Sequence, residues 1–120
     1  MSYKVFKICT ICGSMKFYPA MLDAAQRLSK EGIIVLMPFV TFTGEEEQSS
    51  EQKAMLDEMH FVKIAMSEEI CVVTNTDGYT GLSTQKEMTH ALMNRKGIRV
   101  MEYKETPSGW EYVGVLKSGW

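Results

Sequence analysis

The sequence predicts one α/β domain, a three-layer sandwich with a mainly parallel sheet of four to five strands. Three observations support this fold class. The chain has 120 residues, which is the length of one ordinary domain. Apolar, β-rich runs alternate along it with segments of helical periodicity. The connections between these runs are long enough for crossover helices, which join parallel strands and cover both faces of a sheet.

The first half of the chain provides two strands and one helix. Residues 6–12 are a continuous apolar run, typical of a strand that is covered on both faces. Residues 17–31 have helical spacing, and Pro19 lies in the first turn, where its missing N–H does no harm. Residues 33–37 are the second strand. Residues 39–50 show no periodicity, so they form either a functional lid or a solvated loop.

The second half continues the alternation up to a different kind of tail. We expect helices and strands in turn over residues 51–66, 70–73, 83–96 and 98–101. The α/β domain thus spans residues 1–101. Residues 102–120 alternate charged and aromatic side chains around a turn signal. This pattern predicts a hairpin or an arm that packs on its own domain or on a neighbouring subunit.

The helix expected over residues 51–66 carries its apolar side chains at helical spacing, which predicts the face that packs in the core. The residues of this face are Met55, Met59, Val62 and Met66. His60 lies on an adjacent face, about one turn from Leu56 and from Lys63.

Composition and charge exclude several classes of protein. The formal net charge is -2 and the pI is about 5.7, without the basic stripe that DNA- and RNA-binding proteins carry. No apolar run approaches the ~20 residues that span a bilayer, so we expect no membrane partner. The first seven residues lead straight into a strand and lack the apolar core of a signal peptide. We therefore expect a cytoplasmic location.

Cysteine spacing raises the question of metal or redox chemistry. Cys9 and Cys12 are spaced as C-x-x-C, a pattern found in redox and zinc sites. On a regular strand, however, these two side chains point to opposite faces. A zinc site would need further ligands, and only Cys71, His60 and His90 remain. We therefore expect buried free thiols that behave as small hydrophobic side chains, and no metal site.

The loop after the first strand is one candidate ligand site. Its glycine and serine let the backbone approach a ligand at the first strand-to-helix turn. The segment matches neither a P-loop nor a dinucleotide-binding fingerprint, which argues against magnesium-dependent NTP hydrolysis and Rossmann-type binding. The candidate substrate-binding residues here are Cys12, Gly13, Ser14, Lys16 and Phe17.

The stretch from Val72 to Glu87 is the second candidate site, because it reads as a strand, a glycine-containing loop and a helix opening. Ligands of open α/β sheets bind outside the carboxyl ends of the strands, and a helix opening offers free N–H groups to an anion. Glu87 is either a catalyst or the partner of Thr84 in a capping box. The candidate substrate-binding residues here are Asn75, Asp77, Gly78, Tyr79, Gly81, Ser83 and Thr84.

Two segments resemble the nucleoside 2-deoxyribosyltransferase-like family. One is Ile11 to Phe17. The other runs from His60 and Lys63 through Gly78-Tyr79-x-Gly81-x-Ser83-Thr84-x-x-Glu87 to Gly97. The resemblance covers residues 5–101. It implies a flavodoxin-like domain with the sheet order 2-1-3-4 that binds a nucleoside or nucleotide between the loops of the first and third strands. It also implies that the protein needs no cofactor and no metal and forms a homo-oligomer.

The resemblance also implies a reaction. A glutamate at the position of Glu87 attacks the sugar C1′, the N-glycosidic bond breaks, and water or a second base then takes the sugar from the enzyme. Family members commonly carry an aspartate in or near the second helix, where this sequence has His60, with Asp57 about one turn earlier. His60 is then the candidate general acid, since its unperturbed pKa is about 6.5, and a structural histidine is the alternative.

Three functional readings follow. The first is N-glycosidic cleavage or transfer, with a monophosphate slightly favoured because Lys16, Ser83 and Thr84 could face an anion. The second is a non-catalytic nucleotide-sensing domain, which the missing helix-two carboxylate favours. The third, a flavin electron carrier, is weaker, because the first loop lacks a hydroxyl-rich phosphate loop.

Overall fold

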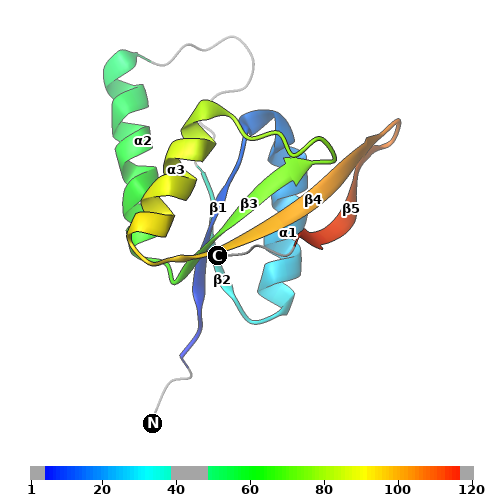
Figure 1. The fold of residues 1–120 in the computed structure, drawn as a ribbon, viewed down its shortest axis with the longest axis horizontal. Helices are drawn as coiled ribbons and strands as arrows, with labels where there is room; N and C mark the ends of the chain where they lie inside the picture. Colours follow the sequence, from blue (N-terminus) through cyan, green and yellow to red (C-terminus); the bar gives the residue numbers. More distant parts are fainter. Residues whose placement is uncertain (1–4, 39–48, 117–120) are drawn as a thin grey trace.

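The computed structural model describes residues 5–38 and 49–116. Within these residues the chain forms one five-stranded sheet in the order β2-β1-β3-β4-β5 (Figure 1). The first four strands are parallel, and β5 runs antiparallel to β4. The predicted order 2-1-3-4 is therefore confirmed, with a fifth strand added at its end. The strands are β1 (Ile8–Cys12), β2 (Ile34–Leu36), β3 (Glu69–Asn75), β4 (Gly97–Thr106) and β5 (Gly109–Leu116).

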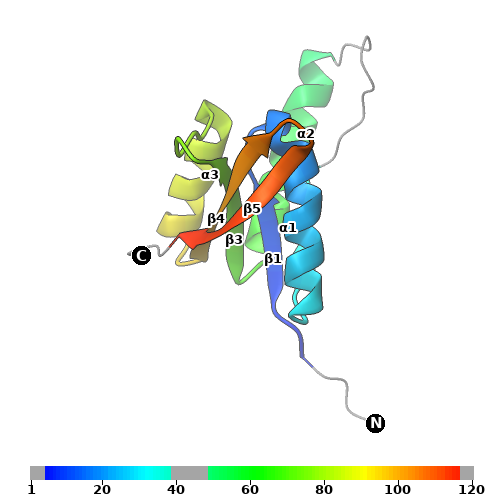
Figure 2. The same cartoon turned by 90° about the vertical axis from the view of Figure 1, so that its right-hand side faces the viewer.

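Helices cover both faces of this sheet. Helix α1 lies on one face, and α2 and α3 lie on the other (Figure 2). Each face has its own buried cluster, and β1 contributes to both: Cys9 and Ile11 face α1, whereas Cys12 faces α2 and α3. The two cysteines point to opposite faces, as the alternation of a strand requires. The helices are η1 (Met15–Phe17, 3-10), α1 (Tyr18–Lys30), α2 (Ser50–Ala65) and α3 (Leu82–Met93).

Helix α2 turns a different face to the core than its apolar spacing predicts. The buried residues of this helix are His60 and Ile64. Periodicity alone does not decide which of two neighbouring stripes faces the sheet, and hydrogen bonds at the helix end select the stripe that carries His60. The prediction that four other side chains pack in the core is wrong, since they are 45% to 58% exposed: Met55, Met59, Val62 and Met66.

A capping box that the sequence analysis did not use opens helix α2. The Ser49 hydroxyl accepts a hydrogen bond from the backbone N–H of Gln52 at 3.1 Å. In return, the side-chain oxygen of Gln52 accepts one from the backbone N–H of Ser49 at 3.0 Å. The lid prediction for residues 39–50 falls almost entirely on residues outside the described ranges. No helix in the described ranges is long and apolar enough to cross a membrane.

The C-terminal tail, as far as residue 116, is a hairpin in the same sheet. Strand β4 continues to Thr106, so the boundary expected at residue 101 falls inside a strand. On β5, the Trp110 ring packs edge-on against Phe17, with ring centroids 5.3 Å apart. Tyr112 packs against the same buried cluster on the α1 face. This part of the tail therefore completes the core of its own domain.

Gly13, directly after β1, occupies a position that only glycine fits. Its φ is +156°, and a Cβ atom there would lie 2.9 Å from both the Val73 carbonyl oxygen and Met21 Cε. Because the carbonyl belongs to a central strand, it has little room to move. We predict that Gly13→Ala lowers the free energy of unfolding by about 1–3 kcal/mol in urea denaturation. Gly114→Ala is the control, since nothing lies within 4 Å of its Cβ position; equal losses would contradict the prediction.

Candidate functional site

The candidate site lies at the topological switch point of the sheet, where the strand order reverses. From β1 the chain crosses to β2 on one side, and it later reaches β3 on the other side of β1. In open α/β sheets the loops diverge at this point, and ligands bind in the resulting crevice at the carboxyl ends of the strands. Cys12 is the last residue of β1, and helix α3 follows the loop after β3. Both loops predicted to bind a ligand therefore begin on adjacent strands.

Hydrogen bonds from β1 set the position of α2. Thr10 and Cys12 are two residues apart on β1, so they point to the same face. The buried Thr10 hydroxyl lies 2.7 Å from the Ser67 hydroxyl and donates to the Lys63 carbonyl at 3.0 Å. One helical turn of about 5.4 Å nearly matches the two-residue rise of about 6.6 Å along a strand. Consequently His60, one turn before Lys63, lies opposite Cys12.

Packing between the two helices sets the position of Glu87. Ala91, one turn later on α3, is fully buried in the cluster between α3 and the sheet, and residues four apart share a helix face. The Phe61 ring of α2 packs edge-on against the His90 ring of α3, with centroids 4.9 Å apart. Glu87 therefore faces the sheet and α2, with its side chain only 13% exposed.

The capping-box interpretation of Glu87 is wrong. Helix α3 is capped by Gly81 without any side-chain hydrogen bond, and Leu82 is the first helical residue. Thr84 is thus already inside the first turn, where its side chain is buried. Glu87 lies in the second turn, too far along the helix to reach the N-cap amide. The inward orientation of the Glu87 side chain therefore has to come from its contacts inside the molecule.

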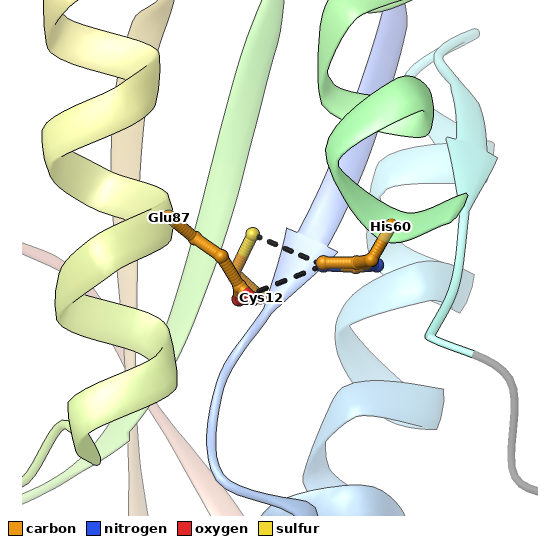
Figure 3. A group of neighbouring side chains, drawn as sticks. All are labelled: Cys12, His60 and Glu87. Carbon is orange, nitrogen blue, oxygen red and sulfur yellow. Dashed lines mark hydrogen bonds and ion pairs between the residues drawn. The ribbon is translucent and has the colours of Figure 1, made fainter. Parts of the chain in front are cut away.

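Three side chains from three elements converge at the end of β1 (Figure 3). His60 Nε2 lies 3.5 Å from Cys12 Sγ and 3.6 Å from Glu87 Oε1. All three polar atoms lie within 4.8 Å of one another. His60 Nδ1 is buried and has no hydrogen-bond partner in the described part of the chain. The polar contacts of the imidazole there are therefore with Cys12 and Glu87.

Burial shifts the protonation of this cluster toward neutral forms. It raises the pKa of Glu87 to about 7; a hydrogen bond from the Cys12 thiol partly offsets this, and the charge of Asp57 adds to it. Burial, together with the nearby Lys63 charge, lowers the pKa of His60 to about 4. Burial and the charge of Glu87 raise the pKa of the Cys12 thiol well above its usual range. Between about pH 4 and pH 7, Glu87 and His60 together therefore hold one titratable proton, and the pKa values place it on Glu87.

The loop after β3 is ordered by its own side chains. The Asn75 side-chain oxygen accepts hydrogen bonds from the N–H groups of Asp77 and Tyr79, both at 3.1 Å. The buried Thr74 hydroxyl donates to the Tyr79 carbonyl at 2.7 Å. Gly78 has a φ of +71°, a conformation that glycine adopts without strain. Asn75 thus has a turn-forming role, while Asp77 is exposed.

The two predicted loops contact each other through aromatic side chains. Lys16 Nζ lies 3.6 Å from the centroid of the Tyr79 ring, a close cation–π contact. The rings of Phe17 and Tyr79 pack edge-on at 6.0 Å, and Phe17 itself is buried. Ser14 precedes η1, where its carbonyl accepts from the Phe17 N–H, and Ser83 is exposed at the α3 opening. Lys16, Phe17 and Tyr79 thus form a second group, separate from the buried cluster of Cys12, His60 and Glu87.

All three residues of the buried cluster are candidates in the sequence, but not as one group. Cys12 is a predicted substrate contact and, with Cys9, part of the C-x-x-C spacing, for which only Cys71, His60 and His90 remain as further zinc ligands. Glu87 does not enter that set. Cys71 and Cys9 belong to the α1 face and are free, buried thiols. A usable signal was present: Cys12 ends a strand, and His60 and Glu87 lie on the two helices that cover that face. Chemically, the cluster can share a proton between a carboxyl and an imidazole, and it offers three metal ligands.

No family model matches this chain, and a search of curated proteins found no significant match.

Proposed function

We propose that this α/β domain is flavodoxin-like and that it binds a nucleoside or nucleotide and cleaves or transfers its N-glycosidic bond through Glu87. The observation that carries this proposal is the contact of Glu87 with His60 at the carboxyl end of β1. A carboxyl group that does not cap its helix, that is only 13% exposed and that titrates near neutral pH fits a nucleophile better than a structural residue.

The pair of Glu87 and His60 can serve both halves of the reaction. The reactive form is the one in which the titratable proton has moved from Glu87 to His60 Nε2. Glu87 is then a carboxylate and His60 is an imidazolium. The carboxylate attacks the sugar C1′, the electrons of the C1′–N bond go to the leaving base, and the base takes the proton from His60. Water or a second base then attacks C1′, with its proton passing to neutral His60, and Glu87 is released as a carboxylate.

A 5′-monophosphate is the preferred substrate class in this proposal. The N-terminal N–H groups of α3 have no side-chain cap, and Ser83 is exposed beside them. Such an opening favours a phosphate through its free N–H groups and the helix dipole. Lys16, which follows β1, lies over the ring of Tyr79 in the loop after β3. It adds a positive charge at the same edge of the sheet.

The rival function is nucleotide sensing without catalysis. The low pKa of His60 favours it, because an imidazole that is neutral at physiological pH is a poor acid. We would incubate the protein with a panel of nucleosides and 5′-monophosphates in the presence of a chelator. Free base would be followed by chromatography, and binding by calorimetry. Release of base supports the enzyme, and binding without release supports the sensor. If the protein neither binds these ligands nor releases base, both functions are overturned.

We also propose that the chain forms a homo-oligomer. The exposed apolar face of α2, formed by Met55, Met59, Val62 and Met66, has the methionine-rich character of subunit interfaces. The double substitution Met59→Glu and Val62→Glu should reduce the mass in sedimentation equilibrium to that of the monomer. Met93→Glu is the control, since that side chain is 79% exposed on α3. A wild-type protein that is monomeric throughout would contradict this proposal.

A further inference from the structure

The buried cluster of Cys12, His60 and Glu87 has the composition of a transition-metal site. A thiol, an imidazole and a carboxyl group are the three kinds of ligand that Zn²⁺ takes in proteins. They come from β1, α2 and α3, three elements that are distant in sequence and are held together by the core. Their ligand atoms lie within 4.8 Å of one another.

The distances fit tetrahedral coordination. With Zn–S about 2.3 Å and Zn–N about 2.05 Å, tetrahedral angles place sulfur and nitrogen about 3.6 Å apart, and nitrogen and oxygen about 3.4 Å apart. The corresponding distances are 3.5 Å between Cys12 Sγ and His60 Nε2, and 3.6 Å between His60 Nε2 and Glu87 Oε1. The third distance, from Cys12 to Glu87, is at most 4.8 Å. Rotation of the Glu87 side chain can shorten it, whereas Cys12 and His60 need not move.

The charges also fit a divalent ion. Thiolate, carboxylate and neutral imidazole carry two negative charges in total, which Zn²⁺ neutralises, so the filled site places no net charge in the core. Binding forms three metal–ligand bonds, and the protons of the thiol and the carboxyl group pass to solvent. Mg²⁺ and Ca²⁺ prefer oxygen ligands and do not suit this set. Three ligands leave one tetrahedral position for water.

We propose that Cys12, His60 and Glu87 bind one Zn²⁺ ion, and that the ion blocks the site by occupying the Glu87 carboxylate. The binding does not depend on the function proposed above. The inhibition does, because it acts on the residue that would attack the sugar. Zn²⁺ should therefore stop the release of base, and a chelator should restore it.

The test uses the whole chain and needs no substrate. Zn²⁺ binding is measured by equilibrium dialysis, and Co²⁺ serves as a spectroscopic probe whose thiolate charge-transfer band reports a bound sulfur. We expect one ion per chain and a Co²⁺ band in the wild-type protein. Cys12→Ser, His60→Gln and Glu87→Gln should each weaken Zn²⁺ binding by on the order of 10²-fold or more, since loss of outer partners alone costs 10–100-fold.

Two matched variants separate this site from other ligands. Cys71→Ser removes a buried thiol of the adjacent strand, and His90→Gln removes the other histidine of the chain; both should bind Zn²⁺ as the wild type does. Circular dichroism confirms the fold of each variant. Absence of the Co²⁺ band in the wild type, or Zn²⁺ affinity unchanged in Cys12→Ser, would overturn the proposal. If Zn²⁺ binds as expected while no nucleotide releases its base, the metal site stands and the proposed reaction fails.

Discussion

Glu87→Gln should abolish the release of base from the substrate. The amide keeps the size of the side chain but cannot form the ester with C1′, so the rate should fall by on the order of 10³-fold or more. Binding should persist, because the loops after β1 and β3 are untouched. The rate is measured by chromatography of the free base under saturating substrate, with chelator present, and binding is measured by calorimetry.

Two comparisons make this result specific to a nucleophile. Glu105→Gln replaces an exposed glutamate on β4 and should leave the rate unchanged. Glu87→Ala leaves a space in which added formate can attack C1′ in place of the missing carboxylate, so formate should restore part of the activity. Full activity in Glu87→Gln would refute the proposed mechanism. Loss of activity together with loss of binding would instead assign Glu87 to holding the substrate.

The activity should show a bell-shaped dependence on pH, with limits near 4 and 7. The reaction needs one proton on the pair of Glu87 and His60, and the pKa values of about 4 and about 7 bound the range in which the pair holds one. The charged groups that act on the pair are Asp57 and Lys63 of α2, and the Cys12 thiol faces it from β1. Beyond each limit, kcat/KM should fall by about tenfold per pH unit.

The alkaline limit is the informative one, because it assigns the acid. In His60→Asn the acid is absent, so a weaker activity should rise through the pKa of Glu87 and then stay level. A wild-type profile that rises through pH 7 without a later decline would mean that the carboxylate acts alone. His60 would then have a structural role, as the alternative interpretation of the sequence holds.

The parallel strands could be predicted because their signals are local. The apolar runs at residues 6–12 and 70–73, separated by helical segments, predict parallel strands. The order 2-1-3-4 came with the resemblance to a known family, because periodicity does not determine which strands are neighbours. The same reasoning predicts that the two candidate loops lie near each other, since the carboxyl ends of adjacent parallel strands share one edge. The antiparallel strand β5 could be anticipated only as a hairpin or an arm, because the tail lacks a strong strand pattern.

The candidate site could not be assembled from the sequence, because it depends on long-range contacts. His60 lies opposite Cys12 because the Thr10 hydroxyl donates a hydrogen bond to the Lys63 carbonyl on α2. These two residues are 53 positions apart in the sequence. Because Gly81 is the N-cap of α3, Glu87 has no capping role, although its spacing to Thr84 fits a capping box. Local patterns do not contain the angle at which two helices cross the sheet.

The opposite pKa shifts of Glu87 and His60 also have a consequence for folding. Between pH 4.5 and 7 the native protein retains a Glu87 proton that the unfolded chain loses, so this group lowers stability as pH rises. Between pH 4 and 6.5 the unfolded chain takes up a His60 proton that the native protein refuses, so this group raises stability as pH rises. Where these ranges overlap, the two contributions cancel, and unfolding exchanges no net proton with the solvent at these groups.

Each contribution alone amounts to on the order of 3 kcal/mol, because the pKa of Glu87 rises from 4.5 to about 7 and that of His60 falls from 6.5 to about 4. The combined contribution of these two groups to stability is thus nearly independent of pH where their ranges overlap. In Glu87→Gln only the histidine contribution remains, and the free energy of unfolding should climb steeply from pH 4 to 6.5. Urea denaturation across this range would reveal the compensation, and parallel profiles for variant and wild type would show that it does not exist.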